Sequence, residues 1–115
     1  MDDVLIYRIQ SLLEHIDLIF NDTNGLTIEE FKKSNLLLRA TCFSLAQIGE
    51  MMIQLEKALA PEYNQLPWAA ARKMRNIIVH DYVGTDVEQV YSTIHQDLPG
   101  LKTAFIAIKN DLTKS

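Results

Sequence analysis

The segment RNIIVHDY, residues 75 to 82, places Arg75, His80 and Tyr82 within eight positions of an otherwise plain helical pattern. Histidine titrates near neutral pH and can transfer protons. A guanidinium is a permanent, forked donor suited to a phosphate that gains charge in a transition state. Together these groups suit RNA cleavage by attack of the 2′-hydroxyl on the neighbouring phosphate, because the substrate then supplies its own nucleophile.

The geometry of a regular helix does not bring all three side chains together. Arg75 and Tyr82 share a face, whereas His80 stands roughly 140° from Arg75, so we expect the helix to end here and relax the arrangement. Arg72, Asn76 and His80 share a polar ridge. A purely structural role stays open, in which His80 caps the helix, Arg75 pairs with a carboxylate and Tyr82 packs with its hydroxyl at the surface.

The reaction needs both a general acid and a general base, but the motif contains one histidine. A two-fold dimer would supply the second. The segment from 34 to 59 supports a homodimer, because it is apolar on two faces and a small bundle usually covers one. The alternative is a central helix wrapped by its own chain. The first apolar set is Leu37, Ile48, Met51, Met52, Leu55 and Leu59, and the second is Leu36, Ala40 and Phe43.

Helical periodicity runs through the chain, with no alternating strand pattern. We expect one domain over 1–115 with an all-α fold, an antiparallel bundle of about four main helices plus short extra helices. The first helix covers 3–21, and the second main helix covers 34–59. A third should begin at Pro67 and stop near Gly84. A further helix should end at Pro99 and Gly100, where the last begins.

Two sequence patterns predict helix starts through capping boxes, Thr27 with Glu30 and Thr85 with Glu88. Trp68 is expected to anchor the start of the third main helix in the core.

Charge and composition exclude several classes of function. The chain has 115 residues and a net charge of -4, which opposes indiscriminate nucleic-acid binding. No apolar run is long enough for a membrane span and the start is acidic, so we expect a cytoplasmic protein without a membrane. We expect Cys42 to be a buried structural thiol. The three histidines lack metal-ligand spacing, so we expect no metal, and no cofactor is indicated.

The motif Arg75, four residues, His80, one residue, Tyr82 matches the R-x4-H-x-Y signature of HEPN domains, and Asn76 follows the arginine as it often does there. QLPWAAARKMRNIIVHDY at 65–82, IGE at 48–50 and DLPGL at 97–101 resemble the HepT family of HEPN toxins. This resemblance covers nearly the whole chain. It implies a helical, usually dimeric, metal-independent ribonuclease toxin.

The resemblance also implies roles for single residues and a partner. Arg75 and His80 would be the catalytic pair, while Asn76, with Arg72 and Lys73, would orient or bind RNA. The partner would be a minimal nucleotidyltransferase antitoxin that transfers AMP to Tyr82, where added bulk and negative charge would repel RNA phosphate. The alternative is a non-catalytic helical module that binds the nucleotidyltransferase and serves as its modification substrate.

Two residues near the motif leave questions open. Lys73 stands where relatives often carry a small residue, and it either adds to the RNA-binding charge or crowds the groove. Glu50 is a carboxylate inside the long apolar helix, and we expect it to pair with Arg75 or Arg39 in a structural role.

Overall fold

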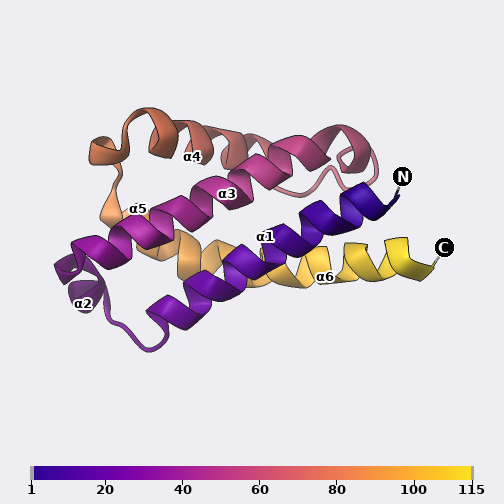
Figure 1. The fold of residues 1–115 in the computed structure, drawn as a ribbon. Coiled ribbons are helices and arrows are strands. Elements are labelled where there is room, and N and C mark those ends of the chain that lie inside the picture. The colour runs from indigo at the N-terminus through magenta and orange to yellow at the C-terminus, as the bar shows by residue number, and fades with distance from the viewer. Residues whose placement is uncertain (1, 115) are drawn as a thin grey trace.

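The computed structural model describes residues 2–114 and contains no strand within them (Figure 1). Four long helices dominate, and short helical turns connect them, which confirms the predicted all-α bundle. The elements in chain order are α1 (Asp2–Thr23), α2 (Ile28–Lys33), α3 (Asn35–Leu59), α4 (Trp68–His80), the 3₁₀ turn η1 (Tyr82–Gly84), α5 (Val87–Ser92), the π-helical turn η2 (Thr93–Asp97) and α6 (Leu98–Lys114).

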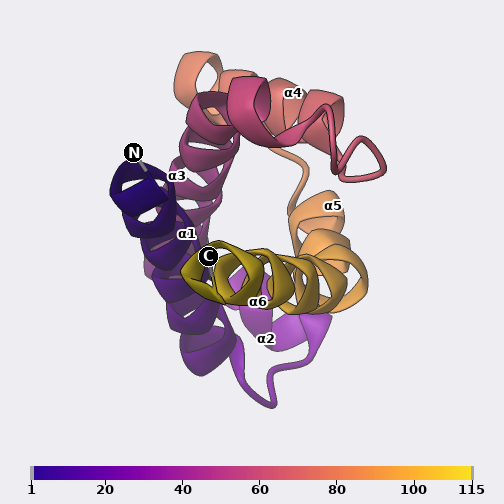
Figure 2. The same ribbon diagram turned by 90° about the vertical axis from the view of Figure 1, so that its right-hand side faces the viewer.

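The long helix α3 is the centre of the packing, with contacts to both α1 and α4. In Figure 2, which looks roughly along the long helices, α1 and α3 lie on the left, α4 lies at the top, α6 lies in the lower centre and α5 lies on the right. By length and composition α3 is apolar enough to cross a membrane. Its buried residues pack into the common core, as expected for the central helix of a bundle.

The apolar stripe of α1 shows why this helix forms and where it packs. Ile9, Leu12, Ile16 and Ile19 recur at spacings of three and four, and each is at most 1% exposed. The helix runs to Thr23, two residues beyond the predicted end, where the Thr23 hydroxyl donates to the Ile19 carbonyl at 2.7 Å.

The predicted capping box of Thr27 and Glu30 is confirmed, and it starts α2. The Glu30 amide donates to the Thr27 hydroxyl at 3.1 Å, and the Glu30 carboxylate accepts from the Thr27 amide at 2.9 Å. Ser34 then caps α3 by accepting from the Leu37 amide.

The start of α4 follows the sequence prediction closely. Pro67 precedes the first helical residue, Trp68, which is 6% exposed. The Trp68 indole donates to the Tyr63 carbonyl at 3.0 Å and meets the Phe105 ring edge-on at 6.2 Å. The predicted anchoring of this helix by Trp68 is therefore confirmed.

The end of α4 differs from the prediction. The helix stops at His80 and not near Gly84, because the Asp81 carboxylate accepts from the Gly84 amide at 3.1 Å and folds the chain into η1. The cap of α5 is also different. Asp86 accepts from the Glu88 and Gln89 amides, so Thr85 does not form the expected capping box.

The expected break at Pro99 and Gly100 is wrong, because helical structure continues from Val87 to Lys114. Proline inside an α-helix loses one hydrogen bond and clashes with the carbonyl four residues earlier. Here the turn before Pro99 is π-helical, with the Leu98 amide bonded to the Thr93 carbonyl, and this wider turn accommodates the ring.

Candidate active site

A close contact between α3 and α4 sets the position of Arg75. A methyl group added at Gly49 would lie 2.8 Å from the Arg75 Cβ and 3.0 Å from the Ala71 carbonyl oxygen. Only glycine allows the two backbones to approach this closely. The approach places the Arg75 side chain directly against α3.

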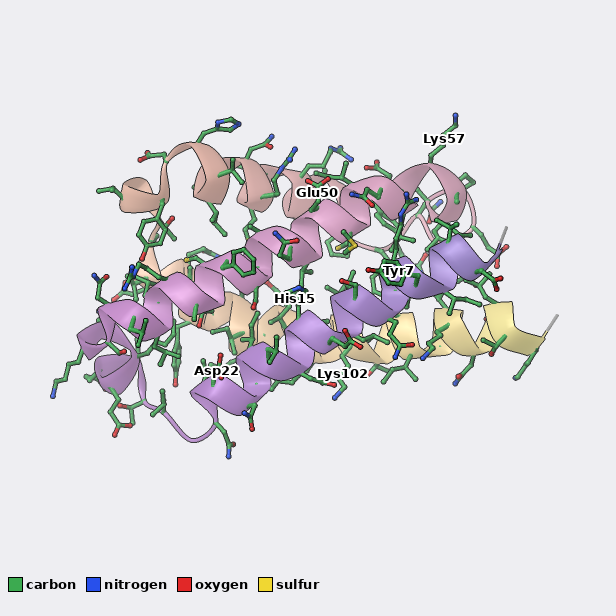
Figure 3. The ribbon with its side chains drawn as sticks, in the orientation of Figure 1. Tyr7, His15, Asp22, Glu50, Lys57 and Lys102 are labelled. Atoms are coloured by element: carbon green, nitrogen blue, oxygen red, sulfur yellow. The ribbon has the colours of Figure 1, made fainter. Side chains whose placement is uncertain are left out.

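The neighbouring residue on α3 binds the arginine. Nη1 of Arg75 donates to Oε1 of Glu50 at 2.9 Å, and Nε2 of Gln54 donates to the second Glu50 oxygen at 3.1 Å. Figure 3 shows Glu50 on the stretch of α3 that packs against α4. The structure thus resolves the open alternative, since Glu50 pairs with Arg75 and not with Arg39.

The polar ridge of α4 is more exposed than Arg75. Arg72 is paired with Glu56 of α3. Asn76, Lys73 and His80 are exposed, and within residues 2–114 the Lys73 and His80 side chains have no hydrogen-bond or ion-pair partner. The imidazole therefore does not cap the helix, and it is exposed to solvent.

A single chain does not bring the two candidate catalytic groups to one point. Because α4 is regular through His80, residues five apart stand roughly 140° apart around its axis. Arg75 faces α3 and is about one third exposed, whereas His80 faces solvent. The predicted relaxation of this arrangement at the helix end does not occur, because α4 stays regular through His80.

Tyr82 is placed differently from the structural alternative, which put its hydroxyl at the surface. Its hydroxyl is buried and has no hydrogen-bond partner among the described residues. The ring lines a shallow groove of 240 Å³ together with Arg39, Cys42, Phe43 and Ile78. Arg39 is a site residue that sequence reasoning missed, because only folding brings it beside the motif.

The second apolar set of α3 is exposed beside this groove. Leu36 is 70% exposed and Phe43 is 61% exposed, and Ala40 lies on the same face between them. We call Leu36, Ala40 and Phe43 the α3 apolar face. Phe43 also meets the ring of His15 edge-on at 6.2 Å, and burial lowers the pKa of His15, which favours its neutral form.

The remaining candidate groups give no second site. Cys42 is buried as predicted, and burial raises its pKa to about 11, so the thiol stays protonated at neutral pH. Within residues 2–114, no group of three or more His, Cys, Asp or Glu side chains is arranged to hold a metal ion.

Several known proteins similar to this chain are named as ribonucleases, in agreement with the motif. The chain is 32% identical over 98% of its length to "Gamma-glutamylcyclotransferase and putative RNase MJ0434" of Methanocaldococcus jannaschii, and it spans half of that longer protein. It is 30% identical to "Putative RNase MJ1216" of the same organism, over 88% of this chain and 84% of that protein.

A further relative is "Probable ribonuclease HepT" of Thermococcus cleftensis, 28% identical over 84% of this chain and 88% of that protein. No solved structure matches the chain. The sequence model of the family described as ribonuclease HepT-like matches residues 12–108, which include the entire motif. The chain therefore belongs to the ribonuclease HepT-like family.

Proposed function

We propose that the protein is the toxin of a toxin–antitoxin pair, a metal-independent endoribonuclease with Arg75 and His80 at a cleft between two copies. The observation that carries this proposal is that one helix of a ribonuclease-family chain carries both an anchored arginine and an exposed histidine, which has no partner within the described residues. Anchoring suits charge stabilisation, and exposure suits proton transfer.

Each group has a defined part in the reaction. The 2′-oxygen forms a bond to phosphorus, and the bond from phosphorus to the 5′-oxygen breaks, which leaves a 2′,3′-cyclic phosphate. His80 takes the 2′-hydroxyl proton, and a protonated His80 of the second copy gives one to the leaving oxygen. The Arg75 guanidinium stabilises the negative charge that develops on the phosphate oxygens.

A homodimer is the assembly that supplies the missing second histidine. The α3 apolar face provides the surface, because it adjoins the groove that contains Tyr82 and remains uncovered in one chain. A two-fold axis near this face would place both motifs around one cleft. Lys73, which has no partner in the described part of the chain, would then add positive charge for RNA, beside Arg72 and Asn76.

The partner that we propose is a minimal nucleotidyltransferase antitoxin, which transfers AMP from ATP to Tyr82 in the cytoplasm. The tyrosine oxygen forms a bond to the α-phosphorus, and pyrophosphate leaves. Because the hydroxyl is buried, the transfer requires the turn η1 to open. The added phosphate would repel RNA from the same cleft.

The second candidate is a non-catalytic module that docks the nucleotidyltransferase and serves as its substrate. The exposed α3 apolar face favours it, since such a face can equally bind a different protein. An exposed histidine without a partner favours the enzyme, because a docking surface has no need of a proton-transfer group.

The experiment compares RNA cleavage by the wild type, His80→Ala and His95→Ala. His95 is the matched control, as it is exposed on η2 and its ring lies 4.3 Å from that of Tyr91. We expect His80→Ala to lose at least about 100-fold in rate while its fold and oligomeric state stay unchanged, and His95→Ala to cleave normally. Equal cleavage by the two variants would contradict the assignment.

A further inference from the structure

We propose that Glu50 is the positioning residue of the active site, fixing the Arg75 guanidinium for the transition state at some expense of RNA affinity. This inference deepens the proposed ribonuclease function and rests on it. It concerns the contact between α3 and α4, where Arg75 Nη1 lies 2.9 Å from the Glu50 carboxylate.

Glu50 is the dominant restraint on the orientation of the guanidinium. The buried Nε of Arg75 has no hydrogen-bond partner within the described residues, so the bond to Glu50 alone fixes the planar group. Gln54 holds the other carboxylate oxygen at 3.1 Å, and this second bond restrains the Glu50 side chain in turn. Two consecutive hydrogen bonds, from Gln54 to Glu50 and from Arg75 to Glu50, therefore hold the arginine in a fixed position relative to α3.

The planar shape of the guanidinium lets one hydrogen bond orient the whole group. Its five N–H donors lie in one plane with fixed directions, so one anchored nitrogen determines where the others point. Glu50 accepts from Nη1. Within the described residues Nη2 makes no hydrogen bond, so its two donors remain for another acceptor. A phosphate oxygen can bind there without breaking the pair.

The negative charge of Glu50 has an opposite effect on binding. It partly cancels the positive charge that attracts RNA, and both partners are only about one third exposed, so salt screens the pair less than a surface pair. Removal of the carboxylate should therefore affect rate and affinity differently. A residue with a purely structural role would not separate the two quantities.

The test measures single-turnover cleavage at saturating RNA and, separately, RNA affinity for Glu50→Gln. We expect the maximal rate to fall about 10- to 100-fold, because a small misplacement of a catalytic group has effects of this size. The RNA dissociation constant should stay equal or fall. Glu88→Gln is the control, since it removes the carboxylate of the exposed pair with Lys32 at 3.0 Å and should change neither quantity.

A double substitution tests whether Glu50 acts through the arginine. If it does, Arg75→Lys combined with Glu50→Gln should cleave no more slowly than Arg75→Lys alone, because the anchored guanidinium is already absent. A wild-type maximal rate in folded Glu50→Gln, or an additive loss in the double variant, would overturn the positioning role. Absence of cleavage by the wild type would instead overturn the proposed function on which this role rests.

Discussion

At the scale of the residue, the polar groups of the motif have distinct environments. Arg75 is anchored by Glu50 and His80 is exposed to solvent, while the buried Tyr82 hydroxyl has no hydrogen-bond partner among residues 2–114. Pairing of Glu50 with Arg75 or Arg39 could be predicted, because a carboxylate inside an apolar helix needs a cation, and the fold selects Arg75. The burial of the tyrosine could not, since it depends on the turn that follows α4.

The Tyr82 hydroxyl gives a prediction about stability. Burial of an unpartnered hydroxyl costs about 1–3 kcal/mol, so Tyr82→Phe should raise the free energy of unfolding by roughly 1 kcal/mol, and it should also abolish AMP transfer. Tyr91→Phe is the matched control, because its hydroxyl donates to the Leu26 carbonyl at 2.7 Å. The free energy of unfolding of that variant, measured by chemical denaturation, should fall by about 1 kcal/mol. A loss of stability in Tyr82→Phe would show that its hydroxyl has a partner.

At the scale of the element, one of the two predicted capping boxes forms. Thr27 and Glu30 start α2 as their spacing indicates, whereas Asp86 caps α5 in place of Thr85. The end of α4 and the π-helical turn depend on competition between neighbouring signals. Asp81 stops the helix before Gly84 can, and a wider turn absorbs the ring of Pro99.

The contact between α3 and α4 is tested at Gly49. Gly49→Ala gains helix propensity but forces its Cβ to within 2.8 Å of the Arg75 Cβ and 3.0 Å of a backbone oxygen. We expect a net loss of about 1–3 kcal/mol in unfolding free energy and reduced cleavage, because α4 moves away from α3.

Gly100 provides the control for this substitution. It also lies in a helix, but apart from the adjoining helix backbone no atom of the described residues lies within 4 Å of an added Cβ. Gly100→Ala should therefore raise the free energy of unfolding by about 0.5–1 kcal/mol and leave cleavage at the wild-type rate. A stabilised, fully active Gly49→Ala would show that close approach of the helices is not required.

At the scale of the whole molecule, the fold class and the main helices could be predicted from periodicity and caps alone. The relation between the motif and its surroundings could not. Arg39 and Phe43 reach the groove with Tyr82 only through the packing of α3 against α4. The second apolar set of α3 did predict a face that the chain's own packing leaves uncovered.

That face predicts the effect of a charge on assembly. Phe43→Asp should convert the protein from dimer to monomer in sedimentation velocity at micromolar concentration, because a carboxylate cannot be buried there without a partner. Cleavage should fall in parallel, since the proposed cleft needs two copies. Ile106→Asp, at a 41% exposed position on α6, should stay dimeric and active. A dimeric, active Phe43→Asp would place the interface elsewhere.

The most direct test of the central claim identifies the RNA ends made in EDTA by the wild type and by His80→Ala, using mass spectrometry. The proposed mechanism requires no metal and uses the 2′-hydroxyl as nucleophile, so the wild type should produce 2′,3′-cyclic phosphate ends under these conditions. His80→Ala, folded and dimeric, should produce none above background. Loss of wild-type cleavage in EDTA, or the same ends from His80→Ala, would contradict the account.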